Sequence, residues 1–179
     1  MSSRFERIAT EKIFEGKFFD VERGTFRHED GTEVKRENVT HPGAVGVVVL
    51  EGDELWFVRQ PREAVGIPDL LEIVAGKLDV EGEDPLEAAK RELAEEIGKQ
   101  ATEWESLGSF FTTPGFTNET IHLFLARGIS DVDRPEVEED ERIHVEIRSL
   151  SDLDEILATN ADSKTLIALY RFRDRFGAR

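Results

Sequence analysis

The stretch from Gly76 to Gly98 reads GKLDVEGEDPLEAAKRELAEEIG and predicts a helix that carries three carboxylates close to its C-terminal end. Negative charge is poorly placed there, because the helix macrodipole is already negative and Glu92 and Glu96 form a like-charged i, i+4 pair. A cation bound between Glu92, Glu95 and Glu96 would reverse the sign of this penalty. A solvated acidic helix face is the alternative, and charge alone does not separate the two.

The composition indicates a soluble globular protein of one domain, or of one domain with a small appendage. The chain has 179 residues, of which 39% are hydrophobic, and this is enough to form a core. No apolar run approaches the ~20 residues of a membrane span, and the N-terminus lacks the apolar core of a signal peptide. Without cysteine there is no disulfide framework and no thiolate chemistry. We therefore expect a cytoplasmic protein with no membrane partner.

The net charge of −16 restricts the partners further. A field of this sign repels nucleic acid unless a basic patch intervenes, and the arginines within 171–179 are mixed with Asp174. We therefore expect no nucleic-acid partner. A polyanionic substrate would need metal ions to approach this protein, which agrees with a cation at the acidic helix.

The pattern along the chain predicts an α/β sandwich with a mixed sheet, preceded by a small antiparallel β unit. Residues 11–40 alternate as short β stretches around an Asp30-Gly31 turn, and this hairpin unit, 1–41, is too small to be stable alone. We expect it to pack on the main domain, 42–179, or on another subunit. In the main domain we predict a loop at 61–69, strands at 44–50, 55–60, 70–74, 104–111 and 120–126, and helices at 85–97, 153–158 and 164–176.

The helix at 85–97 has clear boundaries in the sequence. Asp84 is the expected N-cap, Pro85 takes the first helical position, and Glu87 completes a capping-box pattern. Gly98 ends the helix. The apolar stripe is formed by Leu86, Ala89, Leu93 and Ile97.

The glutamates of this helix provide hard oxygen ligands at i, i+3 and i+4, which suit Mg²⁺ or Mn²⁺. The 4 histidines are scattered and show no metal-ligand spacing. The sequence also lacks the glycine-rich phosphate loop, the dinucleotide-binding fingerprint and the serine nucleophile elbow. These absences argue against a kinase, a dehydrogenase and a serine hydrolase.

The same stretch resembles the Nudix box of the Nudix hydrolases, in which a Gly, a spacer, a Glu and seven residues precede Arg-Glu-x-x-Glu-Glu-x-Gly. The spacer between Gly76 and Glu83 is one residue longer than usual, and Lys99 stands where an aliphatic residue is usual. The first departure adds a residue to the loop before the helix, and the second lies outside the metal site. The resemblance implies an α/β/α sandwich. The matching positions are Gly76, Glu83, Arg91, Glu92, Glu95, Glu96 and Gly98.

Further segments resemble the ADP-ribose pyrophosphatases within this family. The resemblance implies Mg²⁺-dependent hydrolysis of ADP-ribose to AMP and ribose 5-phosphate, with two or three Mg²⁺ ions and with Mn²⁺ as a substitute. Hydrolysis of another nucleoside diphosphate sugar and ligand sensing without hydrolysis are the alternatives. The segments are Leu71–Gly76, Thr113–Glu119, Ile121–Ala126 and, fifteen residues after Lys99, Pro114, for which an ordinary turn is the alternative.

The resemblance also implies roles for residues around the helix. Arg91 would orient a glutamate through a salt bridge, and Glu83 would hold the helix in place by pairing with Arg91. Glu95 would bind metal or support the other ligands. The implied metal ligands are the carbonyl oxygen of Ala75 and the carboxylates of Glu92, Glu96 and Glu141.

The base that activates the attacking water is expected in the acidic run at 136–141. Glu139 aligns best with the position of the base, and Glu138 is a close competitor. A solvated loop is the alternative for most of these acidic residues.

For the substrate, the resemblance implies stacking of Phe18 or Phe19 on the adenine, and it implies a homodimer. In several family members the N-terminal strands swap between subunits, so Phe19 and Arg36 would act across the interface. Hairpin or interface packing is the alternative for the phenylalanines, and a plain surface charge is the alternative for Arg36 and Arg62. The implied substrate-binding residues are Phe19, Arg36, Arg62, Glu72 and Pro114.

Overall fold

The computed structural model describes residues 4–17, 19–133 and 142–177. The chain forms two compact units, one of residues 1–43 with 111–120 and the other of residues 44–110 with 121–179. Each unit is described by itself. The predicted division into domains 1–41 and 42–179 concerns independent folding and stays a prediction.

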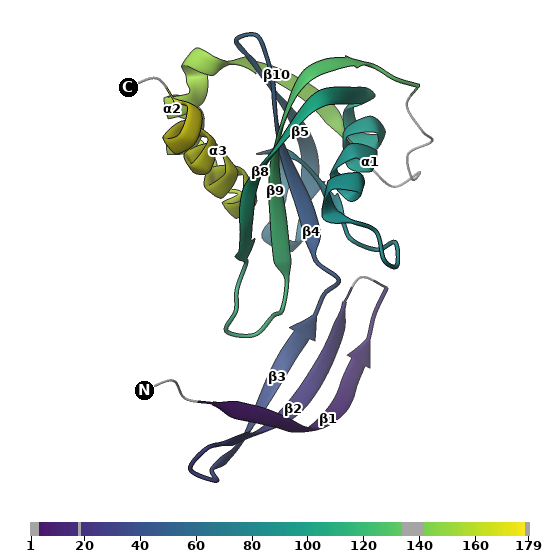
Figure 1. The fold of residues 1–179 in the computed structure, drawn as a ribbon, viewed down its shortest axis with the longest axis vertical. Coiled ribbons are helices and arrows are strands. Elements are labelled where there is room, and N and C mark those ends of the chain that lie inside the picture. Colours follow the sequence, from purple (N-terminus) through teal and green to yellow (C-terminus); the bar gives the residue numbers. More distant parts are fainter. Residues whose placement is uncertain (1–3, 18, 134–141, 178–179) are drawn as a thin grey trace. The chain divides into compact units, whose positions relative to one another are not determined.

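The first unit contains a three-stranded antiparallel sheet in the order β1-β2-β3 (Figure 1). The Asp30-Gly31 turn is present, with Gly31 at φ 82°. The predicted hairpin did not include β1. This strand is exposed along nearly its whole length, so its sequence has no apolar alternation from which a strand could be predicted. The strands are β1 (Phe5–Glu15), β2 (Asp20–His28) and β3 (Glu33–Thr40).

The segment 111–120 belongs to this first unit because it bonds to the end of β3. The amide of Val39 donates to the carbonyl oxygen of Phe116 at 2.7 Å, and Val39 and Thr117 form a parallel bridge. Pro114 lies in a turn closed by a bond from the Phe116 amide to the Thr113 carbonyl at 3.1 Å.

The second unit is a mixed sheet between helices, which confirms the predicted architecture. Its order is β10-β5-β4-β9-β8, with β6 on β5 and β7 on β4; β4 is parallel to β9 and antiparallel to β5 and β7. Figure 1 shows α1 on one face and α2 and α3 on the other. The strands are β4 (Ala44–Glu51), β5 (Glu54–Arg62), β6 (Ile67–Glu72), β7 (Val74–Lys77), β8 (Lys99–Phe111), β9 (Thr120–Asp131) and β10 (His144–Ser149). The helices are α1 (Pro85–Ile97), α2 (Leu153–Thr159) and α3 (Ser163–Phe176), with short 3₁₀ turns at Glu63–Val65 and Leu150–Asp152.

Strand β4 divides the core because successive side chains of a strand point to opposite faces. Val47 and Val49 belong to the cluster that contains Leu93 of α1. Val48 belongs to the cluster that contains Leu169 of α3. All five side chains are at most 1% exposed, so α1 and α3 are both anchored to the central strand.

The boundaries of α1 are those predicted. The Asp84 side chain accepts from the Leu86 amide at 2.9 Å, and Gly98 ends the helix at φ 64°. Glu87 does not complete the capping box but accepts from Lys90 at 2.7 Å. Within the described ranges, no helix is long and apolar enough to span a membrane.

Two elements of the second unit differ from expectation. The predicted loop at 61–69 is mostly a hairpin, because β5 runs to Arg62 past a register shift at Pro61, where a strand tolerates proline, and β6 starts at Ile67. Strand β10 was not predicted. Its apolar Val145 and Ile147 are exposed while the charged residues between and after them are half-buried, which reverses the usual pattern.

Candidate active site

The last two turns of α1 bring two carboxylates into the protein interior. Glu92 and Glu96 are 8% and 5% exposed, whereas Glu95 is half-buried. The last turn of α1 carries no basic residue to offset the macrodipole. The apolar residues Leu93 and Ile97 are also buried, so packing holds the acidic residues against the sheet.

Both buried carboxylates lie against strand β7. The Glu96 carboxylate accepts a hydrogen bond from the amide of Ala75 at 3.0 Å. The Glu92 carboxylate lies over Gly76, where a Cβ would stand 1.8 Å from the Glu92 Cδ. Only glycine leaves room for this approach, which explains the glycine at the start of the motif.

Arg91 links the remaining acidic residues around the helix. Its Nε and Nη2 donate to the two oxygens of Glu83 at 3.2 and 3.1 Å, so the expected pair is present. Its Nη1 donates to Glu92 at 2.7 Å and to Glu95 at 3.0 Å. Nη2 also reaches the carbonyl oxygen of Lys77 at 3.2 Å. The planar guanidinium therefore fixes the helix to the loop that precedes it and to β7.

The ionised form of Glu92 is disfavoured mainly by burial. Burial raises the pKa of Glu92 to about 7, the contacts with Arg91 oppose the rise, and the charges of Glu95 and Asp79 add to it. At neutral pH the ionised form is therefore costly without a further cation. A divalent ion at Glu92 would remove this cost.

The donor set fits Mg²⁺, although the side chains alone do not complete a metal site. Among the residues that the structure describes, no group of three or more acidic or histidine side chains is placed to hold an ion. Mg²⁺ is usually held by one or two carboxylates together with substrate phosphates and water, so Glu92 and Glu96 suffice on the protein side. The carbonyl of Ala75 stays a predicted ligand. Glu139 and Glu141 lie outside the described residues.

Two of the predicted substrate-binding residues form an ion pair in the second unit. Glu72 is 0% exposed and accepts from Arg62 Nε at 2.6 Å and Nη2 at 2.7 Å, and it also contacts Lys164 Nζ. Burial would raise the pKa of Glu72, but the bonds from Arg62 and Lys164 outweigh it and hold this pKa below its ordinary value. Substrate contact by Glu72 and Arg62 stays a prediction.

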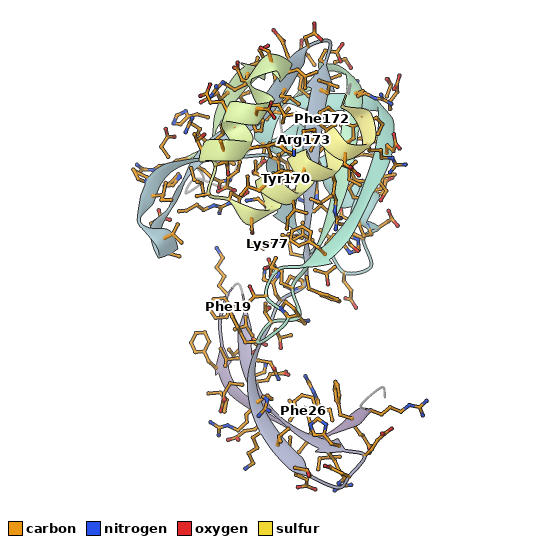
Figure 2. The ribbon with its side chains drawn as sticks, turned by 90° about the vertical axis from the view of Figure 1, so that its left-hand side faces the viewer. Phe19, Phe26, Lys77, Tyr170, Phe172 and Arg173 are labelled. Atoms are coloured by element: carbon orange, nitrogen blue, oxygen red, sulfur yellow. The ribbon has the colours of Figure 1, made fainter. Side chains whose placement is uncertain are left out.

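The other three predicted substrate-binding residues lie in the first unit. The ring centroid of Phe19 is 6.2 Å from that of Phe14, and Phe19 is 45% exposed (Figure 2). Arg36 is exposed on β3, and Pro114 is exposed in its turn. These residues and the acidic residues of α1 therefore belong to different units.

Sequence reasoning missed two residues of α3 that reach the same region. Lys164 contacts Glu72, and the Thr165 hydroxyl accepts from the amide of Ile73 at 2.9 Å. The only signal in the sequence was the predicted helix at 164–176, which places both residues in its first turn but does not predict their contacts.

The sequence is similar to those of several known proteins. The chain is 41% identical over 138 residues to an ADP-ribose pyrophosphatase of Mycobacterium tuberculosis, covering 76% of this chain and 66% of that protein. It is 37% identical to an ADP-ribose pyrophosphatase of Bacillus subtilis, covering 90% and 89%. It is also 37% identical to a methanol dehydrogenase activator of Bacillus methanolicus, covering 94% of each.

A solved structure and a family model give the same assignment of fold. A crystal structure of an ADP compounds hydrolase superposes with a TM-score of 0.83 at 20% identity, covering 98% of this chain and 97% of that one. A family model described as the NUDIX domain matches residues 40–170, which include the whole of α1 and its contacts with β7. The chain therefore belongs to the Nudix family.

Proposed function

We propose that this Nudix protein hydrolyses the pyrophosphate bond of ADP-ribose to AMP and ribose 5-phosphate with Mg²⁺. The observation that carries the reaction class is the pair of buried carboxylates, Glu92 and Glu96, held on Gly76 and Ala75, together with the burial that raises the pKa of Glu92 to about 7. The choice of substrate is supported by the two ADP-ribose pyrophosphatases among the relatives.

The side chains of the site act mainly by holding the cation and its ligands in fixed positions. Glu92 and Glu96 would hold the cation, and Arg91 keeps Glu92 and Glu95 oriented while Glu83 fixes the guanidinium. Bound Mg²⁺ would neutralise the diphosphate and lower the pKa of a bound water. The oxygen of the attacking water forms a bond to one phosphorus while one P–O bond of the P–O–P link breaks. The base accepts the proton of the water, and the leaving phosphate keeps the electron pair.

Loss of turnover on metal removal is the first expected result. Purified protein with ADP-ribose and Mg²⁺ should release AMP and ribose 5-phosphate in equal amounts, because cleavage of the P–O–P link yields one of each. EDTA should abolish turnover, and added Mg²⁺ or Mn²⁺ should restore it. Chromatography of the nucleotide products measures this. Turnover of another nucleoside diphosphate sugar but not of ADP-ribose would reject ADP-ribose as the substrate and keep the reaction class. Tight ADP-ribose binding without product formation would indicate a ligand sensor.

Glu139 is the proposed base, and a matched pair of variants tests the assignment. Glu139→Gln should lower kcat at least about tenfold more than Glu138→Gln, because a positioned base contributes about 10²–10⁴-fold and a neighbouring carboxylate that does not take the proton contributes far less. KM should change little in both variants. Steady-state kinetics with ADP-ribose decides it, and the reverse order of the two losses would transfer the role to Glu138.

The homodimer implied by the family is also a proposal. Strand β1 exposes Phe5, Ile13 and Phe14, which suits burial against a second copy. Light scattering of the full chain in solution would give its molar mass, and a monomeric mass would reject the dimer.

A further inference from the structure

The buried polar side chains of the protein converge on one short segment. Within the described part of the chain, the buried polar or charged residues are Glu72, Glu92, Glu96 and Thr165. Glu92 and Glu96 come from α1 and meet Gly76 and Ala75. Glu72 begins the same segment, 72–77, and Thr165 reaches it from α3 by a hydrogen bond with the amide of Ile73. Such burial is costly unless each group is satisfied, so their convergence calls for an explanation.

The segment 72–77 passes from one strand pairing to another, so the backbone between the two strands needs hydrogen-bond partners outside the sheet. Glu72 ends β6, which pairs with β5, and Val74 begins β7, which pairs with β4. Ile73 lies between the two strands and is 1% exposed, so its amide must find an acceptor outside the sheet. The Thr165 Oγ1 accepts from this amide at 2.9 Å.

The first turn of α3 holds Thr165 in that position. The Thr165 hydroxyl donates to Asp162 Oδ2 at 2.6 Å, and the Thr165 amide donates to the same oxygen at 3.0 Å. The hydroxyl lone pairs are therefore directed at Ile73. Lys164 Nζ bridges Asp162, at 3.1 Å, and Glu72.

The network also includes Arg62, which is half-buried. Glu72 binds both Arg62 and Lys164, so the position of the Arg62 fork depends on the first turn of α3. The hydrogen bond to Glu72 raises the pKa of Arg62, and the charges of Glu72, Asp162 and Glu96 raise it further.

We propose that Thr165 and Lys164 are positioning residues for the metal site. By holding Ile73 and Glu72 they set where the strand presents Ala75 and Gly76 to the carboxylates of α1. The Nudix motif does not include either residue. This inference rests on the metal site of the proposed function and does not depend on the identity of the substrate.

The test compares Thr165→Val with Thr165→Ser in metal-free protein. Valine keeps the volume and removes the hydroxyl, whereas serine keeps the hydroxyl. Loss of a hydrogen bond to a metal ligand typically costs 10–100-fold in metal affinity. Thr165 acts one step further out, through Ile73, so we expect Thr165→Val to weaken Mn²⁺ binding by about tenfold, the lower end of this range. Thr165→Ser should bind Mn²⁺ almost as tightly as the natural protein. Titration calorimetry without substrate measures both constants.

A stability control separates positioning from general weakening. Phe172, on the same helix and 3% exposed, belongs to the apolar cluster that contains Leu169 and Ile73, and it makes no polar contact with the segment 72–77 (Figure 2). Phe172→Leu should lower Tm while leaving Mn²⁺ affinity unchanged. Equal affinity loss in Thr165→Ser and Thr165→Val, or unchanged affinity in Thr165→Val, would overturn the proposal.

Lys164 provides a second pair if Thr165→Val does not fold. Lys164→Met should weaken Mn²⁺ binding, because Glu72 loses one of its two cations and the segment loses a restraint. Lys164→Arg, which keeps the charge, should weaken it less. Failure of the natural protein to hydrolyse ADP-ribose would leave these binding results intact, so the two proposals fail separately. Equal affinity in Lys164→Met and the natural protein would count against the role of Lys164.

Discussion

Gly76→Ala is expected to lower kcat/KM for ADP-ribose by about 100-fold, the loss typical of a displacement of about 1 Å in a catalytic site. The added Cβ would stand 1.8 Å from Cδ and 2.0 and 2.2 Å from the carboxylate oxygens of Glu92. Neither the strand nor the Glu92 side chain can move easily, because β7 is paired with β4 at Val45↔Gly76 and Glu92 accepts a hydrogen bond from Arg91. The carboxylate must leave its position, and Mn²⁺ affinity should fall together with activity.

Gly52→Ala is the matched control for this variant. Gly52 lies in the β4–β5 turn at φ 57° with open space around it, so alanine there adds backbone strain but touches no group of the site. It should lower Tm and leave kcat/KM near that of the natural protein. Steady-state kinetics, Mn²⁺ titration and thermal unfolding of both variants give the comparison. A Gly76→Ala protein with normal kcat/KM would show that the close approach of Glu92 to β7 is not needed.

The parts of the site that sequence reasoning predicted are local. The spacing of Glu92, Glu95 and Glu96 is a property of one helix, and the helix could be placed because its cap residues are short-range signals. The Arg91–Glu83 pair also lies within one motif. A match of this kind predicts which residues meet, because the loop and helix between them leave few other arrangements.

The parts that were missed depend on contacts between distant residues. Nothing near Glu72 in the sequence indicates that it is fully buried, because its partners Arg62 and Lys164 lie 10 and 92 residues away. The role of Thr165 likewise follows from the break between β6 and β7, where the amide of Ile73 needs an acceptor. Such needs become visible only after the sheet order is known.

Glu92→Gln is expected to have opposite effects on stability and on metal binding. Folding raises the pKa of Glu92 from 4.5 to about 7, so the folded protein binds a proton more tightly than the unfolded chain. A group with a raised pKa costs nothing below pH ~4.5, costs more as the pH rises, and reaches its full cost of about 3 kcal/mol above pH ~7. Metal-free Glu92→Gln, which has no charge to bury, should therefore be more stable than the natural protein at pH 8 and equal to it near pH 4.5.

Metal should reverse this order, because the cation stabilises only the ionised carboxylate. Mg²⁺ should raise the Tm of the natural protein at pH 8 but not that of Glu92→Gln, and the variant should lose at least about 100-fold in kcat/KM, since a direct ligand matters no less than its outer-shell partners. Urea unfolding in EDTA at pH 4.5 and 8, and thermal unfolding with and without Mg²⁺, provide the measurements. Glu87→Gln, on the exposed first turn of α1, is the control and should show neither effect, because Glu87 is solvated. If the natural protein and Glu92→Gln keep the same stability difference at both pH values, Glu92 does not carry a buried charge in the metal-free protein, and the need for a cation at this helix end must come from another group.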